Sequence, residues 1–423
     1  MSQDDKDEQF YRDTEAIAFP KLDDWQLALL EPLGHRRMLR RGELVFKVGQ
    51  RDLGLTVVLS GEVEAFEARD GIEQILGTSG PRGFVGDVAM LNGTSAVAGV
   101  RGKAEESEIL EIPAAELRRA LAELPGVSGL IVNAFIMRRQ RLLRDREFVG
   151  LRVVATDGSR DGHLIHDFLD KNHIPHRLVQ FESEDGRGLC ERLKLAGSDL
   201  PALITATGVP MCKPSLREVA QVAGLLRPLA DEGESEILCD LAIVGAGPAG
   251  LSAAVNAASE GLQTVVLESF APGRQAGSSS LIENFFGFPT GISGGELTNR
   301  AQLQAFRFGA KFSTPAQALS LAFSEGDYSA VLRIEGCNAK LRAKCVIIAT
   351  GADYNRIDAD GCASFEGRGV YYAATAIERQ LCRKSTVIVA GGGNSAGQAA
   401  RFGGDGAQFG AEHGGTRYFG GGL

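Results

Sequence analysis

Residues 245–250 (Gly-Ala-Gly-Pro-Ala-Gly) constrain the fold of this chain more than any other segment. They follow an apolar run, 241–244, and open a stretch, 251–260, whose small and apolar residues are typical of a helix. An acidic residue, Glu268, closes the next apolar run. Strand, glycine turn, helix and strand in this order are the context that a dinucleotide-binding fingerprint requires.

Each glycine of this turn has its own predicted role. Gly245 allows the tight turn, Gly247 lets the main chain approach a pyrophosphate, and Gly250 lets helix and strand pack closely. The phosphates would lie at the helix N-terminus, where unpaired N–H groups and the helix dipole favour negative charge. Glu268 is predicted to accept a ribose hydroxyl. The alternative is a glycine-rich turn with a structural role only.

Length and composition limit the class of protein. A chain of 423 residues, 44% of them apolar, has room for roughly two to four domains with sizeable cores. The net charge of −9 argues against nucleic acid as the main partner. No apolar stretch reaches the roughly 18–20 residues of a membrane helix, and the acidic N-terminus is unlike a secretory signal. These features predict a cytoplasmic protein without a membrane partner. Seven scattered cysteines without a CxxC pair argue against a disulfide scaffold.

Three regions separate along the chain. Residues 1–148 contain short strands punctuated by glycines and a helical segment from 114 to 147, which predicts a sandwich or barrel with helices. Residues 149–230 are predicted to alternate strand and helix in a small α/β unit. An acidic stretch, 231–236, is predicted to be a linker. Residues 236–423 hold the glycine turn in a Rossmann-like α/β region, so the fold class is multidomain.

Residues 42–100 resemble the cyclic-nucleotide-binding β-roll of catabolite-activator-type regulators. The resemblance rests on Gly61, within Leu-Ser-Gly-Glu-Val, and on residues 84–93, Phe-Val-Gly-Asp-Val-Ala-Met-Leu-Asn-Gly. It implies that Gly86 supplies a main-chain N–H to a phosphate. It also implies that Asp87 stands where the family has a ribose-binding Glu.

The arginine that this family places against the cyclic phosphate is absent. Its position holds Ala96, so the phosphate lacks its main cation. Arg82 or Arg101 could substitute. The alternative is a degenerate β-roll that serves for docking or for another ligand. The following helix carries five arginines between residues 138 and 146, which predicts a solvated or subunit-facing surface, as in a homodimer; no DNA-recognition motif follows it.

Residues 149–230 resemble a thioredoxin or glutaredoxin fold. Pro201 matches that family's cis-proline before the third strand. The family's redox dithiol opens the first helix, but the matching loop, 159–162 (Ser-Arg-Asp-Gly), has no cysteine. Thiol–disulfide exchange at this position is therefore excluded, and the fold is predicted to remain as a spacer or binding platform.

Four histidines, at positions 163, 166, 173 and 176, fall close together in this region. No cysteine or paired carboxylate completes a ligand set around them. Ordinary surface or core histidines are therefore predicted, and no metal site is assigned.

Beyond the glycine turn, the sequence resembles low-molecular-weight thioredoxin reductases. Residues 271–289, from Ala-Pro-Gly-Arg-Gln to Phe-Gly-Phe-Pro, are similar to the loop that contacts FAD in that family. The resemblance implies that Gln275 and Asn284 lie near the flavin. It places Arg274 along the pyrophosphate.

A second strand and glycine turn complete this resemblance. Thr350 and Gly351 end a strand in the Ala-Thr-Gly sequence that crosses from the FAD half to the pyridine-nucleotide half of the family. An apolar run, 386–390, then leads into Gly-Gly-Gly-Asn-Ser-Ala, which is similar to the family's NAD(P)H site. The implied contacts are Gly391, Gly393, Asn394, Ser395 and Ala396. Two nucleotide turns imply FAD and NAD(P)H as cofactors and electron transfer through the flavin.

The family's redox dithiol, however, is missing. The two cysteine positions shortly before the second glycine turn hold Ala373 and Ala376, so no catalytic residue is assigned. The chain therefore lacks the thiol pair that passes electrons from the flavin to a disulfide in that family. Cys362 and Cys382 lie nearby in sequence as an alternative pair.

The end of the chain also departs from the family. Nine of the 23 residues in 401–423 are glycine, which predicts neither helix nor strand. The rest of the nucleotide half does not follow after about residue 400, which suggests a truncated or frame-shifted product. The sequence thus predicts an FAD-dependent, NAD(P)H-oxidising reductase of the thioredoxin-reductase superfamily, with its electron acceptor unassigned. The alternative is a catalytically inactive ligand-sensing or scaffold protein.

Overall fold

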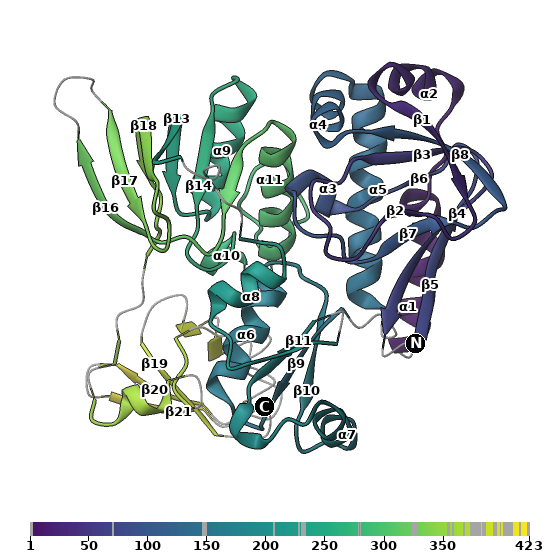
Figure 1. The fold of residues 1–423 in the computed structure, drawn as a ribbon. Helices are drawn as coiled ribbons and strands as arrows, with labels where there is room; N and C mark the ends of the chain where they lie inside the picture. Colours follow the sequence, from purple (N-terminus) through teal and green to yellow (C-terminus); the bar gives the residue numbers. More distant parts are fainter. Residues whose placement is uncertain are drawn as a thin grey trace. The chain divides into compact units, whose positions relative to one another are not determined.

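The computed structural model describes most of the chain, with the elements placed as in Figure 1. Residues outside the description are 1–2, 70–71, 146–149, 206–207, 227–228, 230–233, 278, 280, 324–328, 353–355, 358, 367–368, 373–381, 383–385, 392–395, 398, 401–408, 414–415 and 421–423. The chain divides into two compact units. The first holds residues 1–274 and 298–350, and the second holds residues 275–297 and 351–423.

The N-terminal region forms two antiparallel sheets of four strands each. The strands are β1 (His35–Arg40), β2 (Leu44–Phe46), β3 (Leu55–Ser60), β4 (Val63–Arg69), β5 (Ile72–Ser79), β6 (Phe84–Val85), β7 (Gly99–Gly102) and β8 (Glu106–Ile112). Their orders are β1-β8-β3-β6 and β2-β7-β4-β5. This pair of sheets confirms the β-roll that the sequence predicts.

Helices enclose the β-roll. They are α1 (Gln3–Ala18), α2 (Asp24–Leu30), the 3₁₀ turn η1 (Glu31–Leu33), α3 (Val88–Asn92), α4 (Ala114–Glu123) and α5 (Pro125–Arg144). The segment predicted as one helix from 114 to 147 is two helices, because Pro125 has no N–H to continue α4 but suits the first position of a new helix. No single helix in the described ranges has the length and apolar character needed to cross a membrane; the bent pair α4 and α5 passes that test only jointly.

The middle region is a four-stranded mixed sheet with helices. Its elements are β9 (Leu151–Ala155), α6 (Arg160–Lys171), β10 (His176–Gln180), α7 (Glu184–Leu193), η2 (Gly197–Asp199), β11 (Ala202–Ile204), β12 (Pro210–Cys212) and α8 (Leu216–Val222). The strand order is β10-β9-β11-β12, with β10 parallel to β9 and the other pairs antiparallel. This order, and the cis bond between Leu200 and Pro201, agree with the predicted thioredoxin-like fold.

Serine caps set where the helices of the middle region begin. The hydroxyls of Ser159, Ser183 and Ser215 each accept a hydrogen bond from the main-chain N–H three residues later. Such caps stabilise a helix by roughly 1 kcal/mol. Helix α7 begins at Glu184, directly after its cap at Ser183. The predicted module boundaries at residues 148–149 and 230 lie outside the described residues and stay predictions.

The remaining part of the first unit is built on a six-stranded sheet. Its elements are β13 (Glu236–Val244), α9 (Pro248–Ser259), β14 (Thr264–Leu267), β15 (Lys311–Ser313), β16 (Ala318–Phe323), β17 (Ala330–Ile334) and β18 (Lys340–Ile348). Helices α10 (Arg274–Gly277) and α11 (Gly294–Arg307) each have residues in both units. The strand order is β15-β14-β13-β18-β17-β16. The first four strands in this order, β15, β14, β13 and β18, are parallel to one another. Helix α9 lies alongside β13 and β14 (Figure 1). This is the predicted Rossmann-like arrangement.

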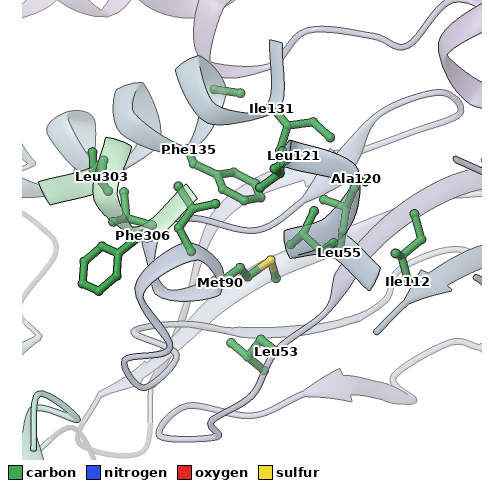
Figure 2. Packing of buried hydrophobic residues seen from close by; sticks show 14 of the residues in the cluster. Leu53, Leu55, Met90, Ile112, Ala120, Leu121, Ile131, Phe135, Leu303 and Phe306 are labelled. Atoms are coloured by element: carbon green, nitrogen blue, oxygen red, sulfur yellow. The ribbon is translucent and has the colours of Figure 1, made fainter. Parts of the chain in front are cut away.

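One hydrophobic cluster joins the β-roll to α11. Phe135 of α5 and Leu121 of α4 are buried in the same cluster as Leu303 and Phe306 (Figure 2). Arg307 adds a hydrogen bond from its Nε–H to the Leu121 carbonyl at 2.9 Å. Each large apolar side chain buried here contributes roughly 1.5–3 kcal/mol, so the cluster holds these two parts of the first unit together.

The second unit contains a short 3₁₀ helix and a small sheet. They are η3 (Cys362–Phe365), β19 (Val387–Ala390), β20 (Phe409–His413) and β21 (Thr416–Gly420). β20 is parallel to β19 and antiparallel to β21. The prediction that the glycine-rich tail builds no strand is therefore wrong. Main-chain ladder bonds need no side chain, and β21 carries Thr, Tyr and Phe, which favour strands.

Two of the four histidines in the middle region form a hydrogen-bonded pair. Nδ1 of His166 lies 2.6 Å from Nε2 of His176, whose Nδ1 lies 2.8 Å from the Ile174 carbonyl oxygen. Because the carbonyl can only accept, His176 carries its proton on Nδ1 and accepts from His166 through Nε2. No group of three or more histidine, cysteine or acidic residues within the described ranges is arranged to hold a metal ion.

Acid is expected to destabilise this module. Burial is the largest cause that lowers the pKa of His176, and of His173, below the ordinary value of 6.5. Asp170 opposes the shift at both histidines, while His166 adds to it at His176 and Arg139 at His173. A base whose pKa is lower in the fold is stabilising above its unfolded pKa and loses that contribution as the pH falls. We therefore expect the urea concentration at the midpoint of unfolding to decrease as the pH is lowered from about 7.5 to about 5.5.

The matched variants for this prediction are His176→Gln and His163→Gln. The first removes the titrating ring and should reduce the fall in the midpoint, whereas the second should keep it. An equal pH dependence in both variants would refute the assignment to His176.

Candidate dinucleotide-binding site

The first glycine turn joins the carboxyl end of β13 to the N-terminus of α9. Gly245 has a φ of +103°, and a Cβ placed there would lie 2.3 Å from the carbonyl oxygen of Ala349. A Cβ on Gly250 would lie 2.0 Å from the carbonyl oxygen of Gly245. These distances are too short for any side chain, so the close passage of strand, turn and helix requires glycine at both positions.

Gly247 is glycine for a different reason. Its φ is −72°, and no heavy atom lies within 4 Å of where its Cβ would be. It is the N-cap of the 12-residue helix α9 and provides no side-chain hydrogen bond to the first turn. The first N–H groups of α9 therefore lack a capping side chain, and the space beside the Cα of Gly247 is open. This combination fits the pyrophosphate of a dinucleotide.

Glu268 lies beneath the turn. It is 1% exposed, and its two carboxylate oxygens accept hydrogen bonds from the main-chain N–H groups of Ala246 and Phe270, both at 2.9 Å. A carboxylate has about four acceptor positions, so capacity remains for another donor. The ribose contact predicted for Glu268 stays a prediction. The structure adds a second role, in which Glu268 braces the turn.

Arg274 belongs to the same cluster. Its Nε lies 3.2 Å from a carboxylate oxygen of Glu268, and its Nη2 donates to the Ser269 hydroxyl at 2.9 Å. Its φ of +44° is in the left-handed region, which is uncommon for arginine. Thr350 also lies here, because a Cβ on Gly245 would be 3.1 Å from its Cα. The structure thus brings together Gly245, Gly250, Glu268, Arg274 and Thr350.

The other residues of the predicted flavin site belong to the second unit. Gln275 donates from Nε2 to the Ala352 carbonyl oxygen at 2.8 Å, next to the predicted crossing residue Gly351. Asn284 has an exposed side chain. Their predicted positions near a flavin stay predictions.

The second glycine turn follows β19. Gly391 has a φ of +130°, and a Cβ placed there would lie 3.7 Å from the Cβ of Ala396. Gly391 and Ala396 are therefore close in space. Gly393, Asn394 and Ser395 lie outside the described residues, as do Ala373 and Ala376.

The β-roll segment predicted to hold a cyclic nucleotide uses its polar groups internally. Gly86 has a φ of +146°, and a Cβ placed there would lie 2.3 Å from Sδ of Met90 and 2.8 Å from the Phe135 ring. Asp87 caps α3 by accepting from the Ala89 N–H at 2.8 Å, and it pairs with Arg139, which is 6% exposed. Neither residue is left free for a ligand by this packing.

Two arginines of α5 face inward, contrary to the solvated surface predicted for that helix. Arg138 donates to the carbonyl oxygens of Ala18, Phe84 and Gly86 at 2.7–3.0 Å, and burial lowers its pKa to about 10. Arg139 pairs with Asp87 and also donates to the His173 carbonyl at 3.2 Å. The run of arginines alone could not reveal these partners, because they are 34 or more residues away in sequence.

The two arginines suggested as replacements for the missing phosphate cation are already paired. Arg82 forms an ion pair with Asp24, and Arg101 pairs with both Glu64 and Glu73. The carboxylates raise the pKa of Arg101 above its ordinary value. Ala96, at the position of the family's arginine, is 5% exposed.

Comparison with known proteins supports two of the resemblances. Residues 239–412 match the family described as pyridine nucleotide-disulphide oxidoreductase, and residues 36–123 match the cyclic nucleotide-binding domain. Thioredoxin reductase of Treponema pallidum is 40% identical over 157 residues, which are 37% of this chain and 49% of that protein. Thioredoxin reductase of Bacillus subtilis is 34% identical over 167 residues, 38% of this chain and 49% of that protein.

A solved thioredoxin reductase of Lactococcus lactis is 29% identical, covers 40% of this chain and 54% of its own, and has a TM-score of 0.37. The chain spans about half the length of the curated relatives it matches. The C-terminal region is thus similar to thioredoxin reductases, and a cyclic-nucleotide-binding-like β-roll precedes it, which confirms the resemblance predicted from the sequence.

Proposed function

We propose that the region from residue 236 onward is an FAD-dependent oxidoreductase that oxidises NAD(P)H. The observation that carries this proposal is the uncapped N-terminus of α9, with open space beside its N-cap Gly247, at the carboxyl end of a parallel strand. Ligands of open α/β sheets bind at this edge. The similarity of residues 239–412 to pyridine nucleotide-disulphide oxidoreductases supports it.

In this proposal the residues of the first turn hold and orient the cofactor. The N–H groups of α9 and the main chain of Gly247 bind the pyrophosphate, and Glu268 takes a ribose hydroxyl while it braces the turn. The turn that begins at Gly391 binds NAD(P)H. FAD, when bound, supplies the redox chemistry by accepting a hydride and passing the electrons on.

The acceptor in this proposal meets the flavin directly. Alanine at 373 and 376 leaves no thiol pair at the family's relay position. Cys362, within the described ranges, is a free thiol. A small quinone-like acceptor or a one-electron carrier needs no thiol relay, and either is consistent with this sequence.

Visible flavin absorbance tests the proposal. The purified chain, reconstituted with FAD, should be yellow, and NADPH added without oxygen should bleach it. A quinone should then restore the colour, whereas a thioredoxin disulfide should not be reduced. A chain that stays colourless after reconstitution would contradict the proposal and support the scaffold alternative.

A further inference from the structure

A cavity of about 790 Å³ lies in the first unit. Its lining comes from three places: Arg51 and Ser95 of the β-roll, Arg217 of α8, and the turn 335–339 between β17 and β18. Pockets that hold small molecules have volumes of about 300–1,000 Å³. The cavity is therefore large enough for a ligand of the size of a mononucleotide.

The cavity borders the cluster around the glycine turn at one edge, where the N–H of its lining residue Ala316 donates to the Glu268 carbonyl oxygen at 2.7 Å. In the parallel pair of β13 and β18, Glu236 lies opposite Lys340, so the turn before Lys340 lies where both strands begin. The glycine turn at Gly245 lies where β13 ends. The lining also includes Ser313, which lies opposite Leu267 at the end of β14, so the cavity extends from the start of the sheet to the end that carries the glycine turn, although no residue of 245–250 lines it.

The floor of the cavity is apolar, and two guanidinium groups reach its lining. Ile334, Ala316 and Ala339 are each no more than 5% exposed. Arg51 donates from Nη1 to the Leu226 carbonyl oxygen at 3.2 Å. Arg217 donates to the main-chain turn of the sheet, from Nη2 to the Gly336 carbonyl oxygen at 2.8 Å.

Neither arginine has a carboxylate partner among the described residues, although Glu234 and Glu335 also contribute to the lining. A guanidinium has five N–H donors. Arg51 uses one of them and Arg217 uses two, so both keep donors for an anion. Main-chain carbonyls position these two charges without neutralising them.

Two glycines with positive φ allow the walls to meet. A Cβ on Gly224, at the end of α8, would lie 2.3 Å from the Ser95 hydroxyl. A Cβ on Gly336 would lie 2.8 Å from the guanidinium carbon of Arg217. The contact at Gly224 is closer than a side chain permits, and both glycines have a positive φ that disfavours other residues.

We propose that this cavity binds a small organic anion with a flat apolar body and a phosphate or carboxylate group. The apolar floor takes the ring, and Arg51 and Arg217 take the anionic group through charge-assisted hydrogen bonds. Because the lining comes from the β-roll, α8 and the sheet, the ligand would contact all three. This inference goes beyond the proposed reductase function and does not depend on it.

Titration calorimetry with 1-naphthyl phosphate tests the proposal, since this probe has a flat ring and a phosphate but no nucleotide features. We expect the purified chain to bind it and to bind 1-naphthol, which lacks the charge, at least about tenfold more weakly. Arg51→Ala and Arg217→Ala should each weaken binding of the phosphate by about tenfold or more.

Arg333→Ala is the matched control, because Arg333 is an exposed arginine of β17 outside the cavity lining. It should bind the probe as the unchanged chain does. Arg217→Lys keeps the charge and should retain part of the affinity. No binding at millimolar probe, equal binding of 1-naphthol, or unchanged affinity in both alanine variants would each overturn the proposal.

Discussion

Gly247→Ala is expected to leave the fold intact and to weaken FAD binding by about 10–100-fold. The new methyl group meets no protein atom, since nothing lies within 4 Å of its position. It would instead occupy the space through which a pyrophosphate approaches the N–H groups of α9. Losing one charge-assisted hydrogen bond costs about 1.5–3 kcal/mol, which corresponds to this range. Flavin fluorescence during titration with FAD measures the affinity.

Two further glycine variants show whether the effect is specific. Gly250→Ala puts a methyl group 2.0 Å from the Gly245 carbonyl oxygen and should lower the free energy of unfolding by about 1–3 kcal/mol. Gly129→Ala, in α5 with open space around the new methyl group, should not lower the stability and should not change the flavin affinity. If Gly247→Ala binds FAD as tightly as Gly129→Ala does, the phosphates do not lie at this turn.

The glycine turn was predictable because its determinants are local. Gly245 and Gly250 contact each other across five residues, and Glu268 reaches the turn from the end of the adjacent strand. Contacts between residues this close in the sequence require particular residue types at a fixed spacing, so they can be recognised from the sequence. The short strands of the β-roll were also predictable as elements, because glycines separate them in the sequence. The order of strands within the sheets was implied only by the resemblance to known folds.

The partners of charged side chains were not predictable in the same way. The arginines at 138 and 139 belong to a run that suggests a solvated surface, yet their partners lie on other elements, 34 to 120 residues away. The His166–His176 hydrogen bond likewise depends on how α6 packs on β10. Sequence spacing shows which residues share an element, but tertiary packing decides which charges are buried and with whom they pair.

Asp87→Ala is expected to lower the free energy of unfolding of the β-roll by about 3–5 kcal/mol. The substitution removes the carboxylate that pairs with Arg139, whose side chain is 7% exposed and would be left as a buried charge without its ionic partner. It also removes the cap on the Ala89 N–H at the start of α3. If Asp87 served only to bind the ribose of a ligand, its removal would not lower the free energy of unfolding in this way.

Asp87→Asn separates the two contributions, because the amide oxygen keeps the cap but not the charge. The single tryptophan of the chain, Trp25, reports unfolding of this region, since its ring lies against Gly126 at the start of α5. Glu62→Ala is the matched control: its ion pair with Lys103 is nearly half exposed and should cost less than about 1 kcal/mol. A urea midpoint for Asp87→Ala equal to that of Glu62→Ala would show that Asp87 does not hold the β-roll together. Asp87 would then have no demonstrated structural role. A ligand-binding role for Asp87 would regain support, even though Ala96 stands at the position of the family's arginine.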